Sequence, residues 1–385
     1  MGQEMYRAPE AVDIEVDPVD KAINKKVVRN AEVHWPNIKS EIIVDIPIKP
    51  TIEEGETFVK TIESVAQTEH PATLTKNEFD QQLRVEHTIE VHGEVATYYM
   101  VEPPFDPTVS QEWIVIVGGF STTKDNYSEE LLHLAQSGRK VLFINPEMSA
   151  HTIKDEHPTT AYMNATIKSE ADLLRRVLDA EGIDKADFVA HSRGAAVATT
   201  LIAQNPGRAR RLLLDSPAGL IGKDTPKELM SRSRAEMVSR IKTEHSLRPL
   251  TSFAGRFLRR LKLHVKEEIP AIADTDIRPL LRVIQEYSNE HAEDDPVETI
   301  LLNPNSDRIF PPKRIEAALG NNPFEYFNKW IVYVDPEAYH GQIYQPDTFG
   351  VASDGESIQQ RHTLIEQLMN APKNGWEEGA STNLH

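Results

Sequence analysis

Ser192 lies where a short apolar run gives way to a helical pattern of small residues. The apolar run ends at Ala190, and Gly194 follows two residues after the serine. This order predicts a strand, a sharp turn and a helix with almost no linker, so the hydroxyl would face free backbone N–H groups at a helix amino end. The pattern Ala-x-Ser-x-Gly therefore indicates a nucleophile elbow. An ordinary serine cap at a helix start is the alternative.

Two later residues have the chemistry to activate this serine. A serine hydroxyl needs a base to take its proton, and the base needs an acid to orient it. Asp307 follows a predicted strand over residues 299–303, and His340 follows another over residues 330–334. Loops at the carboxyl ends of parallel strands converge on one edge of a sheet. We therefore expect Ser192, Asp307 and His340 to meet as nucleophile, acid and base.

Other residues compete for the roles of acid and base. Asp215 also comes at the end of a predicted strand and is the alternative acid, whereas Asp335 is a weaker candidate because it adjoins the strand that delivers His340. His151 and His157 follow an earlier strand and fit the base less well. Taken alone, an Asp in a loop rich in Pro, Asn and Ser is usually a turn former. The order of the three residues along the chain favours Asp307 and His340.

Acyl transfer also requires N–H donors for the developing oxyanion. The residue after the nucleophile, Arg193, supplies one backbone N–H. The second is expected from Phe120, in a loop with Gly118 and Gly119 that directly follows a predicted strand over residues 113–117. A simple turn is the alternative. A phosphate loop is disfavoured because the Lys and the spacing of that motif are absent.

The remaining pattern indicates an α/β fold with a mostly parallel sheet. Short apolar runs alternate with helical segments, an order that places helices on both faces of the sheet. A hairpin from about residue 82 to residue 100, turning at His92–Gly93, would add antiparallel strands at one edge. The other expected strands are 113–117, 140–145, 187–191, 210–215, 299–303 and 330–334, and the helices include 128–137, 159–180, 312–319 and 357–369.

The alternation of predicted strands and helices is interrupted once. Residues 220–295 lack strand patterns and predict a helical insertion, with helices at 227–242, 251–262 and 276–290. We expect a core made of residues 82–219 and 296–372, an N-terminal extension over 1–81 with one helix at 53–67, and a flexible tail over 373–385. Apolar residues of the insertion could line an acyl pocket, but helix packing explains most of them.

Composition excludes several classes of function. The 385 residues include no cysteine, which rules out disulfides, thiolate-ligated zinc and a cysteine nucleophile. A net charge of −18 disfavours nucleic acid as a partner, and no apolar stretch is long enough to insert stably in a membrane. We expect a cytoplasmic protein. The stretch 223–282 is relatively basic, typical of a solvated helix face, with a local site for anions as the sharper alternative.

These motifs resemble those of the serine α/β-hydrolases. The likeness rests on Val117–Phe120, Ala190–Gly194, the loop 303–312 and Tyr339–Gly341, in the family's order of Ser, Asp and His. The branch of capped esterases, lysophospholipases and meta-cleavage-product hydrolases is the most similar, because its cap is inserted where residues 220–295 lie. Val117, where a His often stands, and Ala190, where Gly is commoner, depart from the pattern without removing a catalytic group.

The resemblance implies a cofactor-independent serine hydrolase with a lipase-like or esterase-like acyl-enzyme mechanism and a small-molecule acyl substrate. The same triad in related enzymes hydrolyses carbon–carbon or amide bonds, or transfers the acyl group to another acceptor. A catalytically inactive binding module with the same fold is an alternative of another class. The substrate, the oligomeric state and the role of the N-terminal extension are not predicted.

Overall fold

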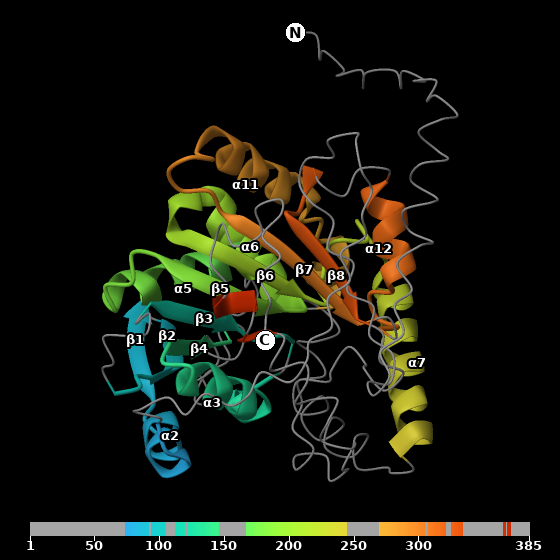
Figure 1. Cartoon of the computed structure of the whole chain (residues 1–385). Helices are drawn as coiled ribbons and strands as arrows, with labels where there is room; N and C mark the ends of the chain where they lie inside the picture. Colours follow the sequence, from blue (N-terminus) through green and yellow to red (C-terminus); the bar gives the residue numbers. More distant parts are fainter. Residues whose placement is uncertain are drawn as a thin grey trace, which may run out of the picture.

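The computed structural model describes residues 74–91, 94–104, 112–120, 122–145, 167–244, 269–304, 307–320, 325–333, 365–366 and 368–370. Its centre is an eight-stranded sheet in the order β1-β2-β4-β3-β5-β6-β7-β8, with helices on both faces (Figure 1). Only β1 with β2 and β2 with β4 pair antiparallel, and all other neighbours are parallel. The predicted fold, a parallel sheet with a hairpin at one edge, is therefore confirmed.

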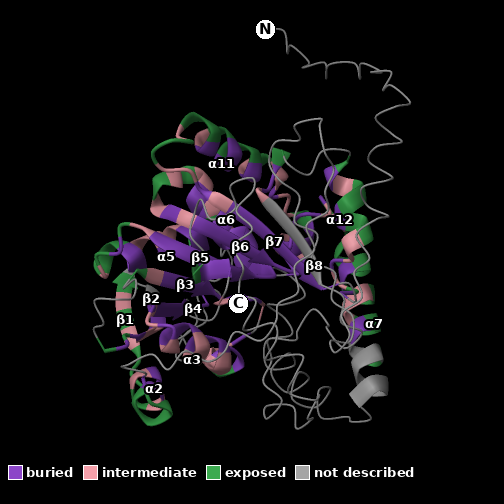
Figure 2. Cartoon of the chain, in the orientation of Figure 1, coloured by how far each residue is buried: buried purple, intermediate pink, exposed green. Residues whose placement is uncertain are grey.

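The strands are short apolar runs, as the sequence predicts. The strands β3 to β7 are buried along nearly their whole length, because helices cover both of their faces (Figure 2). The strands are β1 (His87–Val91), β2 (Glu94–Val101), β3 (Trp113–Val117), β4 (Lys140–Ile144), β5 (Ala186–His191), β6 (Ala209–Asp215), β7 (Glu298–Pro304) and β8 (Lys329–Tyr333).

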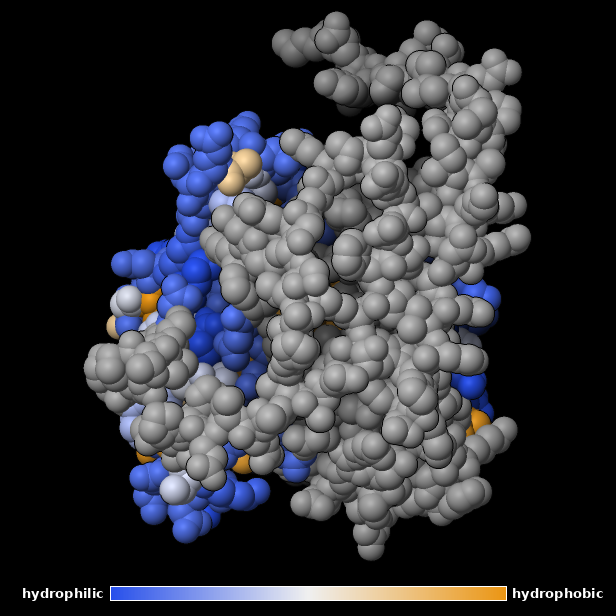
Figure 3. Space-filling view, in the orientation of Figure 1, coloured by the Kyte–Doolittle hydropathy of each residue, from blue (hydrophilic) through white to orange (hydrophobic). Residues whose placement is uncertain are grey.

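Two hydrophobic clusters fill the layers on either side of the sheet. One joins the sheet to α5 (Ile167–Ala180), α6 (Arg193–Gln204), α10 (Ile269–Asp274), α11 (Arg278–Glu290) and α12 (Pro312–Leu319). The other joins it to α2 (Lys76–Leu83), α3 (Ser128–Gln136) and the side chains of Ile365, Leu368 and Met369. The outer surfaces of α2 and α11 are mainly hydrophilic (Figure 3). Helix α7 (Pro226–Glu244) runs along one side of the molecule (Figure 1).

Some predicted elements differ from the structure. The alternation from Gln82 suggested a strand, but Leu83 ends α2 and β1 begins only at His87. The sequence reasoning missed α2 altogether, although Thr75 and Glu78 form a capping box at its start. Because Phe79 and Leu83 are buried in the core, α2 belongs with the sheet and spans the expected boundary between residues 81 and 82.

The insertion also departs from expectation at its end. Helix α11, placed in the cap by the sequence pattern, packs on α6 and buries Leu281 and Ile284 in the cluster that covers the sheet. The predicted helices at 53–67 and 251–262, the start of the one at 159–180 and most of the one at 357–369 lie outside the described residues. No described helix is long and apolar enough to cross a lipid bilayer.

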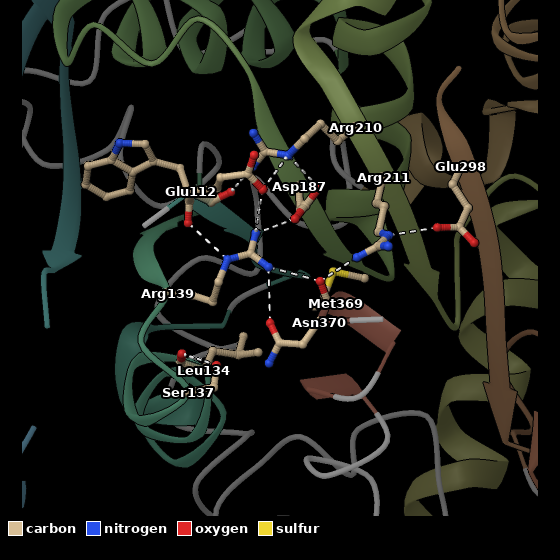
Figure 4. Close-up of polar contacts among 11 residues, drawn as sticks. Glu112, Leu134, Ser137, Arg139, Asp187, Arg210, Arg211, Glu298, Met369 and Asn370 are labelled. Atoms are coloured by element: carbon tan, nitrogen blue, oxygen red, sulfur yellow. Dashed lines mark hydrogen bonds and ion pairs between the residues drawn. The ribbon is translucent and has the colours of Figure 1, made fainter. Parts of the chain in front are cut away.

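A network of ion pairs ties the amino ends of the parallel strands together (Figure 4). Arg139 pairs with Asp187, the second residue of β5, and also donates to the backbone carbonyls of Glu112 and Met369. Arg211 of β6 donates to the carbonyl of Met369 at 2.6 Å and to Glu298 at 2.7 Å. The network therefore fixes the C-terminal helical residues at the sheet edge opposite Ser192.

Candidate active site

Ser192 occupies the sharp turn between β5 and α6. Its backbone has φ 52° and ψ −118°, a strained conformation for a residue with a Cβ atom. Its N–H donates to the carbonyl of Asp215 at 3.0 Å, and its own carbonyl accepts from Ala195 and Ala218. Because these bonds hold the turn on both sides, the structure has the strand–turn–helix geometry expected of a nucleophile elbow.

Close backbone packing requires a glycine at position 194 of the elbow. A Cβ atom at Gly194 would lie 2.3 Å from the carbonyl oxygen of Val117 and 2.6 Å from that of Gly118. No carbon atom fits at those distances. The first turn of α6 is therefore pressed directly against the end of β3, and only glycine allows this approach.

Arg193, the residue after the predicted nucleophile, has a buried side chain. Its guanidinium forms a two-pronged ion pair with Glu170 of α5, and both side chains are 3% exposed. Such paired geometry fixes orientation as well as distance. The pair anchors the first turn of α6 to α5, and with it the backbone from which the first oxyanion donor was predicted.

The glycine loop after β3 is held by three side chains. Gly119 donates its N–H to the Tyr127 hydroxyl at 3.0 Å, while its carbonyl accepts from Asn145 Nδ2 and from the Thr122 hydroxyl, each at 2.8 Å. Asn145 Nδ2 also donates to the carbonyl of Thr122 at 2.8 Å. Tyr127 therefore occupies the N–H of Gly119, and the role predicted for the N–H of Phe120 stays a prediction.

The loop and the elbow are in contact. A Cβ atom on Gly119 would lie 2.6 Å from His191 Nδ1 and 3.2 Å from Ser192 Cβ. The Tyr127 hydroxyl lies 3.4 Å from the same His191 nitrogen. The structure therefore brings together the predicted nucleophile and the predicted oxyanion loop, and Tyr127 bridges the two.

The two candidate acids have different surroundings. Asp215 is the last residue of β6, in register with His191, and is buried. Asp307 is also buried, beyond the end of β7, and its Oδ1 accepts from the N–H groups of Ile309 and Phe310 at 2.8 Å each. The structure thus places Asp307 in a loop at the same sheet edge as Ser192, one strand farther than Asp215.

The predicted base lies outside the described residues, as do Asp335, His151 and His157. The position of His340 relative to Ser192 therefore stays a prediction. In the described part of the chain no group of three or more His, Asp or Glu side chains could hold a metal ion.

Sequence reasoning missed the residues that support the site. Asn145 had a usable signal, because it ends a predicted strand and its amide can bind several backbone groups at once. The contact of Tyr127 with His191 and that of Glu170 with Arg193 had no such signal, because each joins residues that are far apart in the sequence.

Comparison with known proteins agrees with this geometry. A sequence profile of the α/β-hydrolase fold matches residues 112–266, which include the glycine loop and the elbow. No curated protein matches the chain in sequence. Among solved structures, an N-acyl homoserine lactone degrading enzyme is 18% identical with a TM-score of 0.50, covering 71% of this chain and 99% of its own. An esterase from Exiguobacterium antarcticum is 14% identical with a TM-score of 0.49, covering 74% and 100%. Such identities show the fold alone.

Proposed function

Because this chain is a member of the α/β-hydrolase-fold family, we propose that it is a serine hydrolase that cleaves a carboxylic ester or a related acyl bond. The observation that carries the proposal is the backbone of Ser192, held at φ 52° between a buried strand and a helix start. A fold has little reason to keep this strain at a serine unless the hydroxyl needs that position.

The reaction would proceed in two steps. Ser192 Oγ attacks the acyl carbonyl carbon, His340 takes the hydroxyl proton, and the same His then protonates the leaving alcohol. A water molecule, deprotonated by His340, attacks the acyl-enzyme, and the proton returns to Ser192 as the acid leaves. The N–H groups of Arg193 and Phe120 stabilise the oxyanion in both steps.

Asp307 is the acid in this proposal. It would hold one tautomer of His340 and stabilise the imidazolium that forms. Support comes from its place in a loop beyond β7, whereas Asp215 is still within β6 and its carbonyl is bound to the Ser192 N–H. A carboxylate beyond the strand end has more room to reach a His delivered by the loop after β8.

The insertion supplies the roof of the site in this proposal. We limit this role to the segment between β6 and α11, because α11 packs on α6. A cytoplasmic location, a small acyl substrate and the absence of nucleic-acid partners belong to the same proposal.

Hydrolysis of nitrophenyl esters of increasing acyl length tests the activity and defines the acyl pocket. Asp307→Asn should lower kcat by about 10⁴-fold, as loss of the orienting acid does in serine hydrolases. Asp215→Asn is the matched control and should retain most activity. Loss of activity in Asp215→Asn alone would move the acid to Asp215.

A further inference from the structure

Helix α7 contacts the loop that carries Asp307. Arg232 Nε donates to the carbonyl of Ile309 at 2.8 Å, and a Glu236 carboxylate oxygen accepts from the N–H of Arg308 at 3.3 Å. Arg232 and Glu236 are one helical turn apart, so both lie on the same face of α7. We call these two contacts the α7 clasp.

The two contacts of the α7 clasp are made to backbone groups of Arg308 and Ile309, next to the N–H groups that bind the Asp307 carboxylate. The N–H of Ile309 donates to Asp307 Oδ1, while the carbonyl of Ile309 accepts from Arg232. One residue thus connects the carboxylate to the helix. Displacement of Arg232 would move the Ile309 peptides and, through them, the carboxylate.

Arg232 is itself fixed by a second partner. Its guanidinium forms an ion pair with Asp224, whose side chain is only 5% exposed, and Asp224 in turn accepts from the N–H of Thr225 at 2.9 Å. The backbone N–H of Asp224 donates to the carbonyl of Ala273 in α10. The guanidinium therefore spans from the base of the insertion to the acid loop, with a planar fork that a Lys ammonium cannot reproduce.

We propose that Arg232 and Glu236 are positioning residues that set the placement of the Asp307 carboxylate from the insertion. This inference rests on the proposed function, since it assigns a catalytic consequence to Asp307. Through the clasp, the first helix of the insertion orients the acid, so the placement of this helix is coupled to the reactivity of Ser192.

Three substitutions separate this role from simple packing. Arg232→Gln removes the charge and the reach to both partners. Arg232→Lys keeps a charge for Asp224 but loses the fork. Arg234→Gln is the matched control, because this substitution removes the same charge from an exposed position on the same helix. Thermal unfolding of each variant identifies any that fail to fold, and Arg232→Lys remains available if Arg232→Gln does not fold.

The measurement is kcat and KM for a short nitrophenyl ester, for each variant alone and combined with Asp307→Asn. Arg232→Gln and Arg232→Lys should lower kcat by about ten- to a hundredfold with little change in KM, as a displaced catalytic group does. In the Asp307→Asn background the same substitutions should lower kcat no further, because the carboxylate that Arg232 positions is gone.

Equal losses in both backgrounds, or a change in KM alone, would overturn the inference while leaving the proposed function intact. Unchanged kcat in Arg232→Lys would overturn it as well. A wild-type protein that hydrolyses no ester of the series, or an Asp307→Asn variant with full activity, would overturn the proposed function or its acid, and the inference with it.

Discussion

Replacement of Gly194 by Ala tests whether the close approach of α6 to β3 builds the site. The added methyl carbon would lie 2.3 Å from the Val117 carbonyl oxygen, and both of the nearest oxygens belong to backbone. A carbon–oxygen contact needs roughly 3.3 Å, so the helix start and the strand end must separate by about 1 Å. The clash cannot be relieved by rotation of a side chain, because the atoms that the methyl group meets belong to the backbone.

This separation moves Ser192 away from the glycine loop. A displacement of about 1 Å costs on the order of a hundredfold in rate, and overpacking of a buried site costs about 1–3 kcal/mol of unfolding free energy. We expect both losses in Gly194→Ala, measured as kcat/KM for a nitrophenyl ester and by urea unfolding.

Gly207→Ala is the matched control for Gly194→Ala. The same methyl group at Gly207 would meet only the Tyr287 hydroxyl, at 3.5 Å, which is an ordinary contact. This variant should keep wild-type activity. If Gly194→Ala also kept activity and stability within the range of Gly207→Ala, the packing of the elbow against the loop would not be what positions Ser192.

Three further results are expected. Tyr127→Phe leaves the buried N–H of Gly119 without its acceptor and should cost about 1–3 kcal/mol of stability in urea unfolding, with a loss of kcat that Tyr99→Phe does not share. Arg139→Met should lower the free energy of unfolding by about 3 kcal/mol. This is the lower end for a broken buried ion pair, because Arg210 still pairs with Asp187. A variant as stable as the wild type would contradict this. Burial alone would raise the pKa of Asp224, but the hydrogen bonds that its carboxylate accepts, chiefly from Arg232, hold that pKa below its usual value. Asp224 therefore stabilises the fold above about pH 4, and this stabilisation is lost as the pH falls further. Asp224→Asn should therefore be destabilised at pH 7 and much less so near pH 3, and a difference that does not change with pH would refute the assignment.

The elbow and the sheet could be predicted because their signals are local. A buried parallel strand is a continuous apolar run, and the run over β5 ends at Ala190, two residues before Ser192, with Gly194 two residues after it. The small size of Gly194 has a steric reason that the sequence pattern already contains, because a Cβ atom there would meet the backbone of Val117.

The supporting residues could not be predicted because their partners are remote. Arg232 and Glu236 belong to a basic helix whose charge pattern is typical of a solvated face. Only the fold brings them to the backbone of residues 308 and 309. The alternation that began at Gln82 was wrong for a different reason. A period-two pattern across Leu83 and Val85 masked the capping box that starts α2, and burial of Phe79 and Leu83 favoured the helix.

Covalent labelling of Ser192 tests the central claim most directly. A fluorophosphonate reacts with a serine only where a base removes the hydroxyl proton and N–H groups stabilise the charge that develops on the phosphoryl oxygen. We predict stoichiometric labelling of the folded protein, located by peptide mass spectrometry at Ser192, with none in Ser192→Ala. Folded wild-type protein that remains unlabelled, or a label on another serine such as Ser216, would contradict the assignment of Ser192 as the nucleophile.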